Sequence, residues 1–366
     1  MKSGSFLRSA FGCCRFLNMA WAKPKYTREK VNKAGEILIS KNPSDWEVDF
    51  ALGVLNNWRS IHACPLQSMK MTLTGRAKKQ DPNVLVAQRT KRIQAIIFKL
   101  KHHREGNLGL KLSQMQDIGG CRAVLRTVSQ VESLVKYYED STAKNALRGG
   151  KFSKKYDYIK EPKTSGYRSV HLVYKYFSTS TELGVYDDLK IEIQIRSKLQ
   201  HAWATAVETV GFFTGQALKS NIGEESWKRF FALVSSEFAR LEKRPLVPGT
   251  PEKQAESIAE LNTFSAQVDL LEGLKTATRI VENKEGHYFL LELDLEKRTV
   301  RTTVFQKNQM VEAQEKYLEV EKANKDTDNQ AVLVSVDSLA ALPKAYPNYY
   351  LDITEFVKVL KKILGI

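Results

Sequence analysis

Apolar residues recur at helical spacing in several segments. Between residues 46 and 61 they fall on one face, with Val54, Leu55 and Trp58 in the same stripe. A second clear stripe follows Ser197, a residue type that commonly caps the start of a helix. This spacing predicts helices over residues 46–61, 93–100, 131–138, 199–210, 227–241 and 353–364, and one long helix over 253–280.

Shorter apolar runs between these helices predict strands. Residues 288–295 and 299–305 flank a turn at Glu296-Lys-Arg298, a pattern typical of a hairpin. Residues 75–91 are basic and polar, and we expect Arg76, Lys78 and Lys79 to lie on a loop. Residues 139–155 are polar and contain Gly149-Gly150, so we expect a loop there as well. Further strands are expected at 123–125, 170–177, 189–196 and 331–336. Alternating helices and strands up to about residue 215 predict an α/β (α+β) domain.

A cluster of prolines and glycine between Pro245 and Pro251 is the clearest break along the chain. The 366 residues suffice for two or three modest domains. We therefore expect a disordered tail over 1–18, a main α/β domain over 19–245, a linker and helix over 246–280, and a small β-rich domain over 281–366.

The chain is strongly basic, with 57 Lys and Arg against 41 Asp and Glu and a net charge of +16. Such an excess favours a polyanionic partner, a nucleotide or nucleic acid, over the alternative of a merely soluble basic protein. Arg8 and Arg15 interrupt the first apolar run, so a signal peptide fits poorly. No apolar run of about 18 residues exists, so we expect no membrane contact.

The four cysteines, Cys13, Cys14, Cys64 and Cys121, form no C-x-x-C pair. This pattern disfavours a structural zinc site and fits a reducing cytoplasm. Lipidation of the Cys13-Cys14 pair stays open, although nothing else supports an anchor.

Two carboxylates are candidates for chemistry. In strand 189–196 the isoleucines alternate with polar residues, so Glu192 lies at the centre of the polar face. Asp117 stands before Gly119-Gly120, at the start of another strand. Two acids on neighbouring strands suit Mg²⁺, which shares its oxygen ligands with substrate phosphates. A water-facing edge strand would alternate in the same way, and Asp117 alone reads equally as a turn residue.

Cations and aromatics gather on two other segments. Arg89 and Lys91 precede a helix start, where they suit a triphosphate, although a solvated basic face is the commoner outcome. The loop 156–171 carries Lys163 and Arg168 beside tyrosines, including Tyr167 after a glycine. A tyrosine there can stack on a base. His171 and His201 could each take a direct part in the chemistry, or each could be a hydrogen-bonded histidine at the edge of a core.

Four ordered motifs and a fifth short one together resemble the synthetase domain of RelA/SpoT-homologous proteins, over roughly residues 45–215. They are Asp117-Ile-Gly-Gly-Cys-Arg122, Asp157-Tyr-Ile-Lys-Glu-Pro-Lys163, Gly166-Tyr-Arg-Ser-Val-His171, Glu192-Ile-Gln-Ile-Arg196 and His201-Ala-Trp203. The resemblance implies a mixed sheet with flanking helices. It also implies an enzyme that moves pyrophosphate from ATP to a nucleotide 3′-hydroxyl.

The resemblance implies a role for each matching residue. Asp117 and Glu192 match the family's Mg²⁺-binding and catalytic acids, and Tyr167 matches its acceptor-stacking tyrosine. The ATP-binding residues implied are Arg89, Lys91 and Arg122, and the acceptor-binding residues are Lys163, Arg168, His171 and Tyr167. Ser165 departs from the Asn that alarmone synthetases commonly carry, which puts guanine-nucleotide recognition in doubt.

The segment 114–122 is similar to toxic small synthetases, some of which pyrophosphorylate the 3′-CCA end of tRNA. The start at Met19 and the pair Tyr346 and Tyr349 resemble CapRel-type fused toxin–antitoxins of phage defence. That resemblance implies that the two tyrosines block the ATP site until a phage structural protein binds. Aromatic packing is the alternative reading of the pair. We expect a cytoplasmic monomer that acts on tRNA, with synthesis of (p)ppGpp from GDP or GTP, or a catalytically silent RNA-binding or phage-sensing protein, as alternatives.

Overall fold

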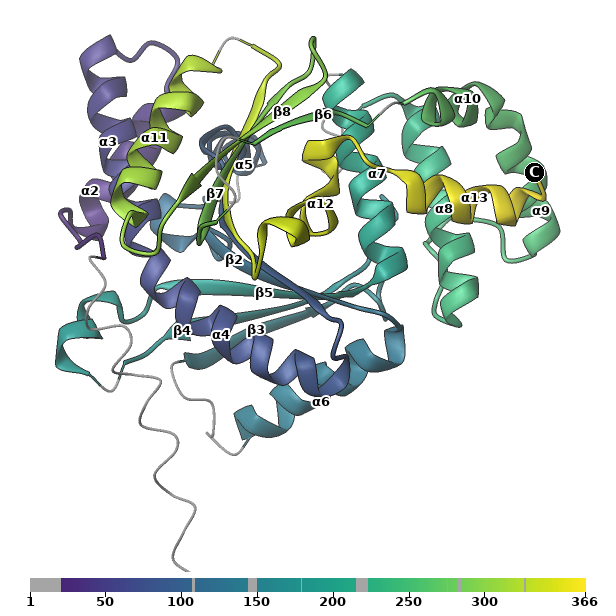
Figure 1. Cartoon of the computed structure of the whole chain (residues 1–366), viewed down its shortest axis with the longest axis horizontal. Helices are drawn as coiled ribbons and strands as arrows, with labels where there is room; N and C mark the ends of the chain where they lie inside the picture. The colour runs from purple at the N-terminus through teal and green to yellow at the C-terminus, as the bar shows by residue number, and fades with distance from the viewer. Residues whose placement is uncertain are drawn as a thin grey trace, which may run out of the picture.

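One mixed β-sheet runs through the whole protein (Figure 1). The computed structural model describes residues 21–366 except 107–108, 144–149, 179, 215–222, 275, 282–284 and 326, so Cys13, Cys14 and all of the expected tail lie outside the described residues. The strands lie in the order β3-β4-β5-β2-β1-β9-β7-β8-β6, and helices flank the sheet. The expected fold class, including a β-rich C-terminal region, is confirmed.

The strands are β1 (Leu85–Thr90), β2 (Gly119–Leu125), β3 (Gly150–Asp157), β4 (Val170–Tyr176), β5 (Lys190–Ser197), β6 (Thr278–Val281), β7 (Tyr288–Asp294), β8 (Thr299–Phe305) and β9 (Gln330–Ser335). The helices are α2 (Arg28–Leu38), α3 (Asp45–Ile61), α4 (Ala63–Gln80), α5 (Ile93–Glu105), α6 (Val128–Ala143), α7 (Lys198–Thr214), α8 (Glu225–Glu242), α9 (Gln254–Leu261), α10 (Ser265–Gly273), α11 (Met310–Ala323), α12 (Leu342–Ala345) and α13 (Thr354–Leu364). Short 3-10 turns include η1 (Leu112–Gln114) and η6 (Pro347–Tyr350).

The C-terminal strands continue the sheet of the main domain. β9 joins β1 antiparallel through two residue pairs, Gln88 with Ser335 and Arg89 with Val334. On the other side of β1, β2 pairs antiparallel with β1 and parallel with β5. The expected C-terminal region therefore lies against the strand that carries Arg89.

Helices cover the sheet in distinct groups. α4 and α6 pack against β1, β2 and β5 and share a core with those strands. α7 packs on β2 and β5 and begins a helical lobe that also contains α8, α9 and α13 (Figure 1). The core of this lobe includes Phe231 of α8 and Phe356 of α13. α13 therefore brings the C-terminal end of the chain back onto α7 and α8. Among the described residues, no helix is both long and apolar enough to span a bilayer.

Several local expectations are wrong. The segment 253–280 is not one helix: it holds α9, a 3-10 turn and α10, and after Gly273 the β-branched residues of β6 pair with β8. Residues 75–91 contain the end of α4 and all of β1, and residues 150–155 belong to β3. In these segments, tertiary pairing overrides a weak local pattern. The helices at 46–61 and 199–210, the Ser197 cap and the 288–305 hairpin are confirmed.

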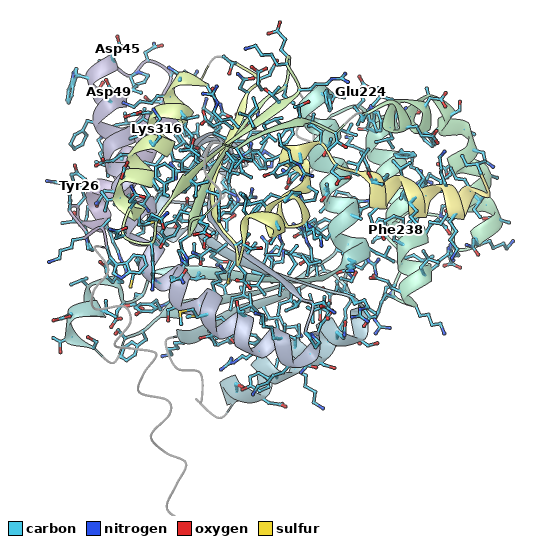
Figure 2. The ribbon with its side chains drawn as sticks, in the orientation of Figure 1. Tyr26, Asp45, Asp49, Glu224, Phe238 and Lys316 are labelled. Atoms are coloured by element: carbon cyan, nitrogen blue, oxygen red, sulfur yellow. The ribbon has the colours of Figure 1, made fainter. Side chains whose placement is uncertain are left out.

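A buried ion pair fastens α11 to the main domain. Nη1 of Arg59 on α3 lies 2.7 Å from Oε2 of Glu321 on α11, and both side chains are almost fully buried. The Arg59 guanidinium also stacks over the ring of Tyr317. A second contact between the helices, Lys322 to Asp49, lies at the surface, where Figure 2 labels Asp49. The attachment therefore depends on the buried pair.

We expect Glu321→Ala to lower the free energy of unfolding by about 3–5 kcal/mol, because it leaves the buried Arg59 cation without its counter-ion. Urea unfolding followed by circular dichroism measures the change. Glu319→Ala is the matched control, since Glu319 lies on the same helix, is exposed and pairs with the exposed Lys316. A shift for Glu321→Ala no larger than that of the control would show that the pair does not hold α11 in place.

Candidate active site

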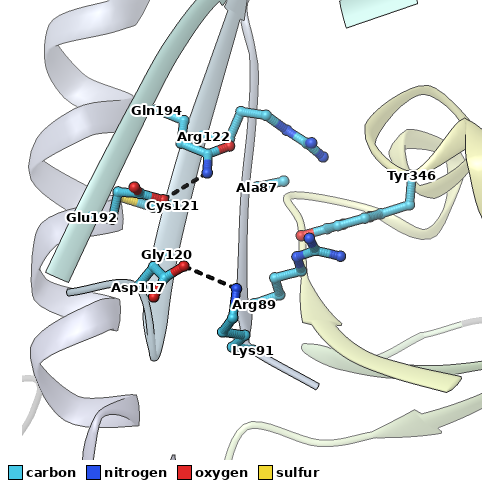
Figure 3. Close-up of a pocket in the computed structure, with 10 residues that line it drawn as sticks. All are labelled: Ala87, Arg89, Lys91, Asp117, Gly120, Cys121, Arg122, Glu192, Gln194 and Tyr346. Atoms are coloured by element: carbon cyan, nitrogen blue, oxygen red, sulfur yellow. Dashed lines mark hydrogen bonds and ion pairs between the residues drawn. The ribbon is translucent and has the colours of Figure 1, made fainter. Parts of the chain in front are cut away.

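A small cavity opens where β1, β2 and β5 meet the C-terminal segment (Figure 3). Its volume is about 60 Å³. Both expected carboxylates and all three expected ATP-binding residues line it. The lining residues are Ala87, Arg89, Lys91, Asp117, Gly120, Cys121, Arg122, Glu192, Gln194 and Tyr346. The structure therefore brings residues from four separate segments to one place.

Asp117 lies just before β2 and binds two lysines. Its Oδ2 accepts from Lys91 Nζ at 2.9 Å, and its Oδ1 accepts from Lys99 Nζ at 3.0 Å. Burial alone would raise the pKa of this carboxyl, but the two ammonium groups hold it well below its usual range. Asp117 is thus a charged group of the cavity. The pattern of cations around residue 91 pointed to Lys91, but no motif pointed to Lys99.

Glu192 lies on strand β5, in register with Gly120 of β2, whose lack of a side chain leaves the cavity open. Ile191, Ile193 and Ile195 are fully buried on the opposite face, so the predicted alternation is confirmed. Glu192 Oε1 is 2.8 Å from His171 Nδ1, and Gln194 Nε2 donates to Oε2 at 2.7 Å. Burial opposes ionisation, but His171 and Gln194 keep the pKa of Glu192 below its usual range. Glu192 is therefore a carboxylate held in a fixed orientation.

A cluster of arginines forms the other wall. Arg89 on β1 and Arg122 on β2 line the cavity. Arg196, the penultimate residue of β5, is buried close to both. Burial and the charge of Arg122 lower the pKa of Arg196 to about 9. Packing guanidinium groups together is unfavourable unless acceptors or anions lie among them. The wall is therefore suited to the oxygens of a polyphosphate.

In this structure the C-terminal segment supplies those acceptors. Arg122 Nη2 donates to the carbonyl of Ala345 at 2.6 Å, and the Arg122 guanidinium lies 5.3 Å from the centre of the Tyr346 ring. His201 Nε2 donates to the carbonyl of Lys344 at 3.0 Å, while its Nδ1 accepts from Arg196. Burial holds the pKa of His201 well below its usual range, in agreement with a neutral ring that accepts at Nδ1.

The two C-terminal tyrosines have different positions. Tyr346 projects into the cavity, and its hydroxyl donates to the carbonyl of Gln88 at 2.9 Å (Figure 3). Tyr349 does not line the cavity: it is fully buried in an apolar cluster, against Phe212, and its hydroxyl reaches the carbonyl of Ala331. The packing alternative therefore describes Tyr349, and contact with the expected ATP site belongs to Tyr346.

The expected acceptor loop lies beyond Glu192. Tyr167 is 6% exposed and its hydroxyl is 2.7 Å from His171 Nε2, so it is connected through His171 to Glu192. Its ring is not open to solvent as the turn predicted, because Tyr158, Trp203 and the Lys163 ammonium surround it. A cation and a partly exposed aromatic ring, Lys163 over Tyr158, form the outer surface here instead.

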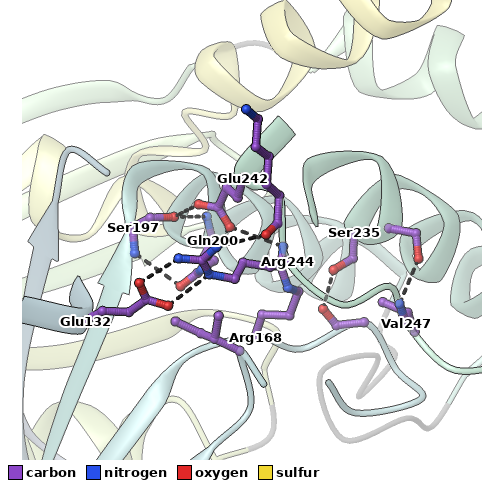
Figure 4. Close-up of polar contacts among 12 residues, drawn as sticks. Glu132, Arg168, Ser197, Gln200, Ser235, Glu242, Arg244 and Val247 are labelled. Carbon is purple, nitrogen blue, oxygen red and sulfur yellow. Dashed lines mark hydrogen bonds and ion pairs between the residues drawn. The ribbon is translucent and has the colours of Figure 1, made fainter. Parts of the chain in front are cut away.

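Arg168 is not at the cavity, contrary to its expected role in acceptor binding. Its guanidinium is buried and pairs with Glu242 of α8, with Nη1 3.2 Å from Oε2 (Figure 4). Gln200 donates to the same carboxylate, and Ser235 donates to the carbonyl of Gly166. These contacts fix the conformation of the loop that carries Tyr167. The sequence motif located the loop correctly but could not show that Arg168 points into the helical lobe.

Gly166 explains why this turn needs glycine. Its φ of +89° lies in the left-handed region, and an added Cβ would lie 2.8 Å from the Trp203 ring and 3.0 Å from the carbonyl of Phe231. A side chain at this position would therefore push the loop away from α7 and α8.

Residues 88–211 match the family model described as "Region found in RelA / SpoT proteins". No curated protein matches the chain. Among solved structures, the small alarmone synthetase 1 of Bacillus subtilis bound to its product pppGpp is 24% identical, covers 51% of this chain and 94% of its own, and has a TM-score of 0.41. A GTP pyrophosphokinase family protein of Streptococcus pneumoniae is 24% identical, with coverages of 49% and 84% and a TM-score of 0.38. The small alarmone synthetase 2 of Bacillus subtilis is 20% identical, with coverages of 55% and 95% and a TM-score of 0.39.

The match to the RelA/SpoT region includes most of the cavity. It contains Arg89, Asp117, Arg122 and Glu192, the charged residues that the strands bring together. This match supports the enzyme class expected from the motifs, a pyrophosphotransferase with ATP as donor.

We expect Glu192→Gln, made in a Tyr346→Ala background, to lower the rate of pyrophosphate transfer by about 10²–10⁴-fold, because the amide keeps the shape but accepts no proton. Binding of a non-hydrolysable ATP analogue should stay within a few-fold. Rates with radiolabelled ATP and binding by calorimetry separate the two effects. Transfer close to that of the Tyr346→Ala parent would mean that Glu192 is not the proton acceptor.

Proposed function

We propose that this protein is an ATP-dependent pyrophosphokinase toxin that modifies the 3′-CCA end of tRNA and is held inactive by its own C-terminal segment. One observation carries the proposal: Tyr346 and the carbonyl of Ala345 lie against the arginine wall of the cavity, and the carbonyl of Lys344 is bonded to His201 beside it. The catalytic groups are thus assembled, but the place for the donor's phosphates is taken.

The closed state leaves too little room for a nucleotide. The cavity of about 60 Å³ is far smaller than ligand sites, which are typically about 300–1,000 Å³. Tyr346 is 2% exposed and Ala345 is fully buried, so the segment fills the site rather than covering its mouth. ATP binding therefore requires α12 and η6 to move.

Asp117 and Glu192 fit a Mg²⁺ ion. They are two ionised carboxylates facing one cavity, and Mg²⁺ is commonly held by one or two carboxylates together with water and substrate phosphates. The described residues hold no group of three or more potential ligands, so most of the ion's coordination would come from ATP. When bound, the ion would offset negative charge on the phosphates. Lys91 and Lys99 pair with Asp117 in this structure, and with the ion on Asp117 both lysines would be able to bind phosphate oxygens.

The protein's own residues account for the rest of the transfer. Arg89 and Arg122 bind the phosphate oxygens and offset the charge that develops on them. Glu192, oriented by His171, accepts the proton of the acceptor's 3′-hydroxyl. The hydroxyl oxygen forms a bond to the β-phosphorus of ATP, the bond between the α-phosphate oxygen and the β-phosphorus breaks, and AMP leaves.

The acceptor side suits a single-stranded nucleic-acid end. Lys154 lies over the ring of Tyr156, Tyr156 stacks on Tyr158, and Lys163 lies over Tyr158. Alternating cations and partly exposed rings are a common surface for unpaired nucleotides, which supply both phosphates and stacking bases. The net charge of +16 supports a large polyanion over a free nucleotide. Guanine nucleotides are the competing acceptor.

The proposed trigger is a phage structural protein that binds the C-terminal region of the monomer and releases Tyr346. Its support is the similarity of the Tyr346 and Tyr349 pair to CapRel-type proteins, together with the closed cavity. Because α13 and β9 pack on the main domain, release needs only a local movement of α12 and η6.

We expect Tyr346→Ala to raise the affinity for a non-hydrolysable ATP analogue by at least about tenfold and to arrest cell growth without phage, because the closed state loses its main contact with the site. Calorimetry and inducible expression give the two readouts. Tyr346→Phe is the matched control: it keeps the ring and loses only the bond to Gln88, so its effect should be smaller. Unchanged ATP affinity and harmless expression of Tyr346→Ala would contradict autoinhibition.

We expect the Tyr346→Ala protein to move label from terminally labelled ATP to intact tRNA. A tRNA that ends in 3′-deoxyadenosine lacks only the acceptor hydroxyl and should receive none. GDP and GTP are assayed in parallel, with products separated by gel and thin-layer chromatography. Label on GDP or GTP alone would identify an alarmone synthetase, and no transfer to any acceptor would identify a catalytically silent binding protein.

A further inference from the structure

Strand β6 forms an unusually open edge of the sheet. Its four residues are all exposed, and Ile280 and Val281 are 41% and 40% exposed. β6 pairs in parallel with β8, and in the part of the chain that the structure describes no strand lies beyond it. Parallel strands are normally covered, and exposed apolar edges are normally blocked by charge, proline or a bulge. This edge is therefore suited to pairing with another chain.

The direction of the backbone groups can be assigned. The N–H of Thr278 donates to the carbonyl of Arg298 at the start of β8, at 2.9 Å. Because successive residues of a strand direct their backbone groups to opposite edges, the N–H groups of Arg279 and Val281 point away from β8. They form a short ladder that a partner strand can complete.

Positive charge lies around this edge. Arg279, Arg298 and Arg301 are all exposed, and the register places Ile280 beside Arg301. Lys297, next to Arg298, is exposed and pairs with Asp294. A partner strand with both apolar and acidic side chains complements this surface better than a basic one.

β6 also connects directly to the segment that closes the cavity. The N–H of Ala277, one residue before β6, donates to the carbonyl of Tyr350 at 2.9 Å, and the Arg279 guanidinium lies 5.1 Å from the centre of the Tyr350 ring. Tyr350 ends η6, the turn that follows Tyr346. A change in the position of β6 therefore acts on the backbone that holds Tyr346 in the site.

We propose that the outer edge of β6 is the docking site for an extended, acidic and apolar segment of a protein partner, which binds by adding a strand to the sheet. The consequence of docking rests on the function proposed above: a partner that draws β6 outward strains the contacts of Tyr350 and favours the open state.

The probe is a synthetic peptide in which Glu and Val alternate. Its length of about ten residues is the upper end of the usual range for strands, so it can cover the whole of β6. A control peptide keeps every Glu and replaces each Val by Pro, so that it has the same charge but cannot form a ladder. Binding to the full-length protein is measured by fluorescence anisotropy, and amide hydrogen exchange over residues 278–281 locates the site. The protein variant is Val281→Pro, which removes an outward N–H, and its control is Val281→Ala.

We expect the Glu-Val peptide to bind about tenfold more tightly than the Glu-Pro peptide and to slow exchange at residues 278–281. Val281→Pro should lose this preference and Val281→Ala should keep it, with both variants melting within a few degrees of the parent protein. Equal binding of the two peptides, or the same preference in Val281→Pro, would overturn the proposal, because charge alone would then explain the binding. The proposed function is tested separately by the ATP affinity of Tyr346→Ala. Unchanged affinity would overturn that function without bearing on whether the peptide binds to β6.

Discussion

The cluster of Arg89, Arg122 and Arg196 is the constraint on which the rest of the arrangement depends. Guanidinium groups packed over the inner strands β5, β2 and β1 lose contact with water and repel one another, and this lowers the pKa values of Arg122 and Arg196. Burial acts on Arg89 in the same direction, but the nearby Glu208 carboxylate raises its pKa. Such a cluster is tolerable only when acceptors lie among its members. In the closed state the Ala345 carbonyl and the face of the Tyr346 ring lie against Arg122, and the charge of Glu208 also stabilises the three guanidinium groups. In the open state they would be phosphate oxygens.

This competition has a structural consequence for regulation. The closing segment is not a loosely tethered domain, because β9 pairs with β1 next to Arg89 and the buried Arg59–Glu321 pair fixes α11. The C-terminal region therefore has two effects on the site. β9 and α11 support the strand that carries Arg89, whereas α12 and η6 block the cavity. A trigger that removed the whole region would expose the cores under α13 and β9, so local displacement is the less costly route.

The sequence predicted those parts of the site that are local in the chain. Glu192 and its buried isoleucines follow from strand alternation, and Asp117, Arg122 and the 156–171 loop follow from motifs within single segments. Contacts between distant segments were not predictable: β9 joins β1, Lys99 reaches Asp117 from α5, and Arg168 turns into the helical lobe. The different roles of two like residues also became visible only in the three-dimensional structure. Tyr346 and Tyr349 are three positions apart, but the turn of η6 sends one into the cavity and the other into the core.

The central claim is that ATP and the 342–350 segment compete for the same arginines. Amide hydrogen exchange of residues 342–350 in the full-length protein, measured across a titration with a non-hydrolysable ATP analogue and Mg²⁺, tests it most directly. The competition predicts that exchange in this segment accelerates in step with the fraction of analogue bound, while exchange in α13 stays unchanged. Saturating binding of the analogue with unchanged protection of residues 342–350 would contradict it, because both would then occupy the protein at once.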